Sequence, residues 1–340
     1  MKKWTKTFLT SFVLTLTMSI TAFAGQWKQD HIGWWYQKDD GSWYANGWEW
    51  IDGNCDGVAE CYYFTPDGYL VVDGIADGYT VNADGAWTEN GVIQRKVTVD
   101  PSNDAAAIAL YQAAQAKYAA LDCIEADASY IMDMTIQDMN VKAGMDLNLK
   151  MTGVRGNNLQ YVMDGTMEMF GATFPVTMFY KDGWYYTDMM DMKIKQPMDI
   201  ATAIANVNEN TGVMEMNLAM IRNMKAEQKD SNTVLTYDMS QEALNNYVQA
   251  ALAQTGTAGE GLSGYKINSA SASVTIDANG NLVQDQVLMD MEMSVIDPET
   301  GTTSDVKYVM DVECNYKNLG QTFTLTFPST EGYTDVTQKQ

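Results

Sequence analysis

Hydrophobic and polar residues alternate with a period of two along most of the C-terminal two thirds of the chain. A period of two is that of a strand with one buried face. Turn sequences such as Lys-Asp-Gly at 181–183 separate the alternating runs, as in β-hairpins. The pattern predicts a meander of antiparallel strands that share one apolar face. The predicted strands cover residues 126–136, 145–151, 161–169, 174–180, 287–295, 308–316 and 323–327.

Helical periodicity is confined to four segments, at 104–123, 199–210, 213–228 and 240–254. In the first, Asn103 or Asp104 is placed to cap the helix. Its apolar stripe consists of Ile108, Tyr111, Tyr118 and Leu121. The other three segments lie between two blocks of strands, which favours an α+β fold with helices packed on one face of the sheet.

Residues 25–94 have a different composition, rich in Trp, Tyr, Gly and Asp. Aromatic dipeptides and tripeptides alternate with Asp-Gly and Asn-Gly turns, which predicts short β-hairpins. Because the units recur at a spacing of about 20 residues, we expect them to stack as a small hairpin solenoid. A linker at 95–103 then leads into a second domain, at 104–335.

The N-terminus has the features of a secretory signal peptide at residues 1–24. Lys2, Lys3 and Lys6 precede an apolar run at 8–20, and Ala22-Phe23-Ala24 is a small-x-small cleavage site. No Cys follows that site, and no later segment is apolar enough to span a bilayer. We therefore expect a secreted protein with no transmembrane segment.

The net charge of −23 argues against two classes of partner. Nucleic acids and anionic membrane surfaces are bound through clustered basic residues, and this chain has 44 acidic and 21 basic residues. The charge suits a secreted protein and tolerates cationic ligands.

Two stretches of the aromatic region resemble the cell-wall-binding, or choline-binding, repeats of Gram-positive surface proteins. They are GWWYQKDDGSWYANGW at 33–48 and YYFTPDGYLVVDG at 62–74. The resemblance implies attachment to a cell-wall polymer, through teichoic acid choline or through glycan. One departure is Gly74-Ile75, where such repeats have Gly-Trp.

Ring faces bind quaternary ammonium groups through cation–π attraction, which makes an aromatic cage the candidate site of this region. The alternative is that the rings are the only core that so small a solenoid can form. The candidate cage residues are Trp34, Trp43, Tyr44, Trp48, Tyr62 and Tyr63.

The second domain resembles Firmicute lipoproteins that are grouped with the LolA/LppX-like lipoproteins and lipid carriers. The resemblance rests on the segments at 126–139, 147–154, 173–189 and 272–283. It implies a strongly curved, unclosed antiparallel sheet, or half-barrel, with helices on its concave face. It also implies a lipid or another hydrophobic ligand. Typical members carry a lipobox Cys, which is absent here, so the aromatic repeats would replace the lipid as the tether.

Many methionines alternate with polar residues at strand spacing, which places them on one buried face. Met fills irregular apolar space, so such a face suits either an ordinary core or a pliable hydrophobic cavity. Copper binding through thioethers is a third, weaker interpretation. The cavity candidates are Met132, Met134, Met167, Met169, Met178, Met289, Met291 and Met310.

The four cysteines of an exported protein suggest disulfides. Cys55 and Cys61 would bridge one hairpin, and Cys123 and Cys314 would tie the start of the second domain to a late strand. Three pairings remain open. The segment from Asp52 to Glu60 also contains Asn54 and Asp56, in the order that opens a calcium loop. Tyr63 at the twelfth position excludes an EF-hand, and a polar hairpin turn is the alternative.

Catalytic signatures are missing from the sequence. His31 is the only histidine, and motifs for a metalloprotease, a serine hydrolase or a phosphate-binding loop are absent. We therefore expect a non-enzymatic envelope protein that needs no cofactor. The alternatives are a surface interaction protein with a packed C-terminal core and a cell-wall hydrolase.

Overall fold

The computed structural model describes residues 25–38, 41–54, 57–136, 139–156, 158–190, 192–203, 218–240, 244–245, 262–296 and 302–336. The predicted signal peptide, most of the predicted helices at 199–210 and 240–254, and the start of the one at 213–228 lie outside these residues. No helix among the described residues is long and apolar enough to cross a membrane.

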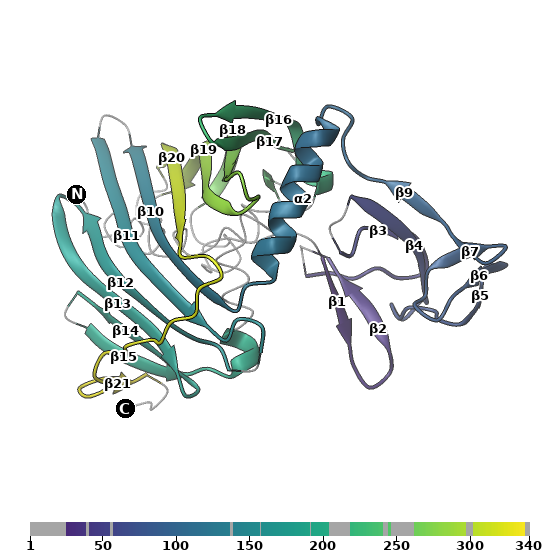
Figure 1. Ribbon diagram of the computed structural model, residues 1–340, viewed down its shortest axis with the longest axis horizontal. Coiled ribbons are helices and arrows are strands. Elements are labelled where there is room, and N and C mark those ends of the chain that lie inside the picture. Colours follow the sequence, from purple (N-terminus) through teal and green to yellow (C-terminus); the bar gives the residue numbers. More distant parts are fainter. Residues whose placement is uncertain are drawn as a thin grey trace.

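A sheet of twelve strands dominates the described part of the chain (Figure 1). Its order is β16-β17-β18-β19-β20-β10-β11-β12-β13-β14-β15-β21, antiparallel except for the last pair. One half contains β10 (Cys123–Ile136), β11 (Met139–Thr152), β12 (Gln160–Met169), β13 (Ala172–Lys181), β14 (Trp184–Met189) and β15 (Met192–Pro197). The other half contains β16 (Ile221–Lys229), β17 (Asn232–Met239), β18 (Leu262–Ile276), β19 (Leu282–Ile296) and β20 (Thr303–Lys317), while the short β21 (Thr334–Asp335) lies beside β15.

The two blocks of predicted strands meet where β10 pairs with β20. Figure 1 shows the resulting sheet strongly curved, with β16–β19 turned across the top relative to β10–β15. The alternation predicted from sequence is confirmed: Met132, Met289 and Met310 are buried on one face, which we call the inner face. The described fold is mostly β, with one long helix and a large curved antiparallel sheet.

The helix α2 (Ala105–Ala119) confirms the first predicted helix. The carboxylate of Asp104 accepts hydrogen bonds from the backbone N–H groups of Ala106 and Ala107, which satisfies two donors of the first turn. Tyr111 and Tyr118 are buried against the sheet and contact Tyr237 and Tyr316 edge to face.

The segment before α2 covers part of the sheet edge. Asn103 exchanges hydrogen bonds with the backbone of Ile221 and Met224 in the edge strand β16, and Ser102 accepts one from Asn223. Edge strands left open pair with other chains, and this cover removes part of that hazard.

The helix predicted at 213–228 is wrong over its described part. Leu218–Met220 is a single 3-10 turn, and Ile221–Lys229 is strand β16. A bulge between Arg222 and Lys225 shifts the register, so Ile221 and Met224 both face the core at a spacing of three. A bulge therefore reproduces the spacing of a helix face.

The strand predicted at 323–327 is also wrong. This segment crosses the outer face of the sheet, where Phe327 and Tyr333 pack on Phe179 and Tyr186. Phe179 and Tyr186 stack with centroids 4.4 Å apart and are buried under this strap. The alternating apolar residues of 323–327 therefore belong to a segment that packs on the sheet and does not form one of its strands.

The described residues of the aromatic region form three small sheets. Strands β1 (Gln26–Gln29) and β2 (Trp34–Gln37) pair; β3 (Gly47–Ile51), β4 (Val58–Phe64) and β9 (Arg95–Val97) form the second sheet; β5 (Gly74–Ala76), β6 (Tyr79–Val81), β7 (Trp87–Glu89) and β8 (Val92–Ile93) form the third. Hairpins are thus present, and the first residues of the predicted linker belong to the module, because β9 pairs with β4.

Candidate functional sites

The rings of the aromatic module fall into three groups, and the first is its core. Tyr36, Ile51 and Phe64 are buried, and Tyr44 and Tyr62 pack on them. Tyr44 and Tyr62 were predicted to be cage residues. Their rings are used for packing, as the alternative interpretation expected.

The second group lies at the end of the module near β1 and β2. Trp34 is 43% exposed and Trp43 is 55% exposed. Trp43 packs edge to face with Trp35, and it lies over the backbone of Gly68, where a Cβ atom would sit 2.5 Å from the indole. These two predicted cage residues do not meet the other predicted members.

The third group, which we call the Trp48 cluster, consists of Trp48, Trp50, Tyr63, Tyr79 and Trp87. Trp48 contacts Tyr63, Tyr79 and Trp87 with centroids 5.2, 5.8 and 6.1 Å apart. Tyr79 and Trp87 meet edge to face at 5.4 Å, and Trp50 packs on Trp87. Trp50 and Tyr79 are exposed, so the cluster opens to solvent.

Two polar atoms of the Trp48 cluster lack partners among the described residues: the Nε1 groups of Trp48 and Trp87 are buried and donate no hydrogen bond there. An unused buried donor costs about 1–3 kcal/mol, which a ligand acceptor would recover. Of the predicted cage, the structure brings only Trp48 and Tyr63 together here. Sequence reasoning missed Tyr79 and Trp87 because their repeat unit departs most from the pattern.

The cysteines predicted to form disulfides are not bonded to one another among the described residues. Cys61, Cys123 and Cys314 are free thiols, and Cys55 lies outside the described residues. The Cys123–Cys314 pairing is wrong, because Cys314 lies opposite Ala128, five residues along β10 from Cys123. Five residues of strand span roughly 17 Å. A disulfide needs Cα atoms about 4.4–6.8 Å apart.

Two of the calcium candidates already have partners within the protein. The carboxylate of Asp52 accepts hydrogen bonds from Gly57 N–H at 2.8 Å and from the Thr98 hydroxyl at 3.2 Å. Glu60 pairs with Arg95 at 3.0 Å. Asn54 is exposed, and Asp56 lies outside the described residues. Throughout the described ranges, no group of three or more His, Cys, Asp or Glu side chains could hold a metal ion.

All eight candidate methionines are buried on the inner face, in two separate clusters. Met132, Met134, Met289, Met291 and Met310 belong to the main core with α2 and β16–β20. Met167, Met169 and Met178 belong to a second cluster with Met145, Leu147, Val176 and Met189.

Between the two clusters, a set of inner-face residues keeps accessible surface. We call Ala128, Leu149, Met163, Cys314 and Tyr316 the inner stripe; all five are half-buried. The register places them side by side, since Ala128 lies opposite Cys314 and Leu149 lies opposite Met163.

Two residues of the inner stripe, Cys314 and Tyr316, are strongly desolvated although they are only half-buried. Burial raises the pKa of the Cys314 thiol and of the Tyr316 hydroxyl well above their ordinary values. Both side chains nevertheless keep accessible surface. The stripe is therefore a candidate binding surface for an apolar molecule.

One carboxyl group lies at the Tyr316 end of the inner stripe. Asp285 on β19 faces Cys314 across the strands and is 1% exposed. Its Oδ2 accepts a hydrogen bond from the Tyr316 hydroxyl at 2.7 Å, and its Oδ1 has no partner among the described residues. Burial raises its pKa from 3.8 to about 7, and the bond from Tyr316 lowers it in part. Nothing in the alternating pattern distinguishes Asp285 from an exposed strand residue.

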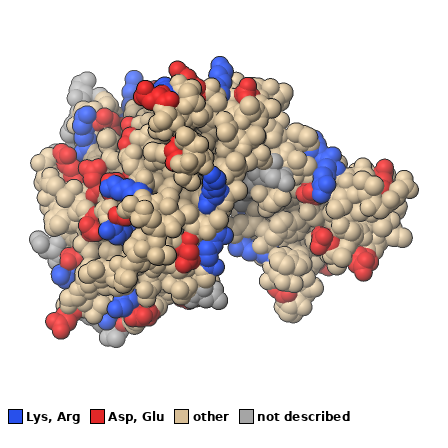
Figure 2. Space-filling view, viewed as in Figure 1, with Lys and Arg blue, Asp and Glu red and all other residues tan. Residues whose placement is uncertain are grey.

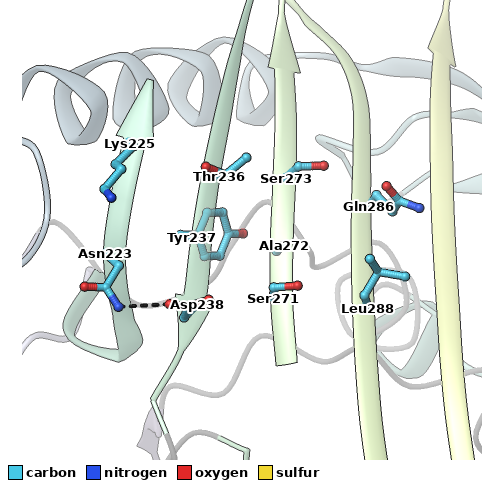
Figure 3. A pocket seen from close by; sticks show the side chains of 10 residues that line it. All are labelled: Asn223, Lys225, Thr236, Tyr237, Asp238, Ser271, Ala272, Ser273, Gln286 and Leu288. Carbon is cyan, nitrogen blue, oxygen red and sulfur yellow. Dashed lines mark hydrogen bonds between the residues drawn. The ribbon is translucent and has the colours of Figure 1, made fainter. Parts of the chain in front are cut away.

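A polar pocket of about 370 Å³ lies on the outer face of β16–β19. Figure 3 shows its side chains standing separately across these strands, with one hydrogen bond, of 2.9 Å, from Asn223 to Asp238. Gln286 also has a partner, since its amide donates to Asp311. The lining offers no paired nucleophile and base.

Acidic side chains outnumber basic ones, and the two kinds are mixed on the surface. Figure 2 shows acidic and basic side chains interspersed on the face in view. Cross-strand pairs include Lys150 with Glu125 at 3.4 Å and Lys193 with Asp188 at 3.1 Å. Figure 2 shows no broad basic patch of the kind that binds nucleic acid on this face.

The profile of a family described as a family of unknown function (DUF6612) matches residues 106–330. The chain belongs to this family. The match spans α2 and the strands from β10 to β20, and it leaves out the aromatic module. No curated protein matches the chain.

Solved structures that resemble the chain are distant. The lipoprotein LppX of Mycobacterium tuberculosis is 10% identical, with a TM-score of 0.38, over 66% of this chain and 100% of that one. LprF of Mycobacterium bovis is 12% identical, with a TM-score of 0.39, over 67% and 99%. The Cpl-1 endolysin, solved with a peptidoglycan analogue, is 16% identical, with a TM-score of 0.17, over 51% and 39%.

Proposed function

We propose that the C-terminal domain binds a hydrophobic ligand, such as a lipid chain, along the inner stripe. The observation that carries the proposal is the accessible surface of Leu149, Met163 and Cys314 on an inner face where all eight candidate methionines are buried.

The lining suits a flexible apolar ligand. Met178 lies opposite Met163 of the stripe, and Met145 and Met167 belong to the same buried cluster as Met178. Unbranched thioether side chains change rotamer readily and adapt to ligands of different shape. Each methylene group that a ligand buries there contributes about 0.8 kcal/mol, so a chain of moderate length supplies useful affinity.

Binding of diphenylhexatriene, an apolar dye that fluoresces in apolar surroundings, tests the proposal. The mature protein should bind the dye, and Met163→Lys should weaken binding at least about tenfold, because it places a charge on the inner stripe. Asp164→Lys is the matched control: Asp164 is exposed on the outer face of the same strand. Dye binding that Met163→Lys leaves unchanged would contradict the proposal, as would the absence of dye binding to the mature protein.

The aromatic module supports a second role, attachment to a cell-wall polymer. Its favouring observation is the Trp48 cluster, which has exposed ring surface and two unused indole donors. Ring faces suit choline groups or sugar rings. We therefore propose an exported, non-enzymatic envelope protein, with a signal peptide at 1–24, a wall-binding module at 25–94 and a ligand-binding domain at 104–335.

Sedimentation with isolated Gram-positive cell walls tests the second role. Trp48→Ala should leave more protein in the supernatant, whereas Trp34→Ala, outside the cluster, should leave the distribution unchanged. Elution by choline would identify the choline group, and elution by glycan fragments would identify the glycan. Equal losses from both variants would assign binding to the rings in general and reject the Trp48 cluster as the site.

A surface interaction protein with a solid core remains the alternative function. It predicts that neither dye nor lipid enters the C-terminal domain. Native mass spectrometry of protein purified without detergent separates the two, because a carrier retains lipid mass and a solid core does not.

A further inference from the structure

A buried carboxyl group, that of Asp285, lies beside the inner stripe. Asp285 is 1% exposed, and among the described residues its hydrogen bond comes from the Tyr316 hydroxyl. The other carboxylate oxygen, Oδ1, has no partner there. Burying a carboxylate oxygen without a donor is costly, so a native protein leaves one only where something compensates for it.

Among the described residues, the surroundings of Asp285 supply no cation to balance its charge. The titratable groups that face it are Cys314 and Tyr316 from β20 and Tyr237 from β17. Burial raises the pKa of all three, so they remain uncharged at neutral pH. Among the described residues, no cationic side chain forms an ion pair with Asp285.

We propose that Asp285 receives the polar end of the ligand at the inner stripe, and that this end carries a hydrogen-bond donor, either a hydroxyl or an ammonium group. The inference rests on the proposed function and narrows it. Cys314 and Tyr316 belong to the stripe and lie beside Asp285, so the polar end of a chain along the stripe comes next to this carboxyl group.

The hydrogen-bonding capacity and charge of Asp285 favour some ligand head groups over others. A hydroxyl or an ammonium group donates to Oδ1 and removes the unpaired acceptor. A ligand carboxylate has only acceptors and carries the same charge, so the site rejects it. An ether offers an acceptor without a donor and gains nothing from an ionised Asp285.

Competition against diphenylhexatriene tests the inference, with decanol, decylamine, decanoic acid and decyl methyl ether as competitors. The measurements are made at pH 8, above the pKa of about 7 at which Asp285 loses its proton. Decanol or decylamine should compete at least about tenfold better than the ether, which is the effect of one hydrogen bond to a charged group. Decanoic acid should compete worst.

Asp285→Leu keeps the size of the side chain and removes both oxygens. It should abolish the preference for donors and leave competition by the ether unchanged. Asp285→Asn keeps an acceptor oxygen without the charge, so it should retain decanol and lose decylamine, which distinguishes the two head groups. Asp164→Leu on the outer face is the control and should behave as the wild type.

The results distinguish failure of the head-group inference from failure of the proposed hydrophobic-ligand binding. If the wild type binds neither dye nor any decyl compound, the proposed function fails. If all four compounds compete equally, or if Asp285→Leu preserves the preference for donors, hydrophobic binding stands and the role of Asp285 is overturned.

Discussion

Replacing Asp285 with Asn should make the protein more stable, and more so as the pH rises. Burial raises the folded-state pKa of Asp285 from 3.8 to about 7. A carboxyl group with a raised pKa holds its proton more tightly in the folded protein than in the unfolded chain. Its contribution to stability is therefore complete below pH 3.8 and is lost as the pH rises to about 7.

The expected magnitude follows from that interval. Between pH 3.8 and about 7, each pH unit removes about 1.36 kcal/mol, so the total loss is on the order of 4 kcal/mol. The amide side chain of the Asp285→Asn variant does not titrate and has the same shape as the carboxyl it replaces. The variant should match the wild type near pH 4 and exceed it by up to this amount at pH 8.

Urea unfolding followed by far-UV circular dichroism measures the effect, because the twelve-stranded sheet dominates that signal. Free energies of unfolding are compared for wild type and variant at pH 4, 5, 6, 7 and 8. Taking the difference removes the contribution of every other titrating group. A constant difference across this range would refute the reasoning, as it would show that Asp285 ionises with an ordinary pKa.

Three further predictions follow from other contacts. Tyr316→Phe removes the hydrogen bond that lowers the Asp285 pKa, so the pH-dependent loss of stability should extend to higher pH in the same unfolding assay; an unchanged profile would contradict the role of this bond. Asp104→Ala leaves two N–H groups of α2 uncapped and should cost about 1 kcal/mol in thermal unfolding, while Asp104→Ser should recover most of it. Peptide mapping of the alkylated, non-reduced protein should find Cys123 and Cys314 unlinked, and a peptide joining them would contradict the strand register.

The sheet was predictable because its signal is local. Residues such as Met132, Met289 and Met310 alternate with polar neighbours, and the alternation alone assigns them to a buried face. The cap of α2 was predictable for the same reason, since Asp104 bonds to N–H groups two and three residues ahead. Two predictions were wrong because a local pattern arose from another structure. In β16, a bulge produces the spacing of buried residues that is typical of a helix. In the segment at Phe327, alternating apolar residues pack on the outer face of the sheet instead of forming a strand.

The candidate sites depended on pairings that no local pattern specifies. The sequence established that the aromatic rings form hairpins and that methionines line one face, because both follow from the spacing of neighbouring residues. Which rings meet was decided by folding, which brought Tyr79 and Trp87 to Trp48 and turned Tyr44 and Tyr62 into core. Folding also placed Asp285 beside Tyr316 on the adjoining strand. The register and curvature of the sheet decide which side chains are buried, and they bury the carboxyl of Asp285 with one oxygen that has no partner among the described residues.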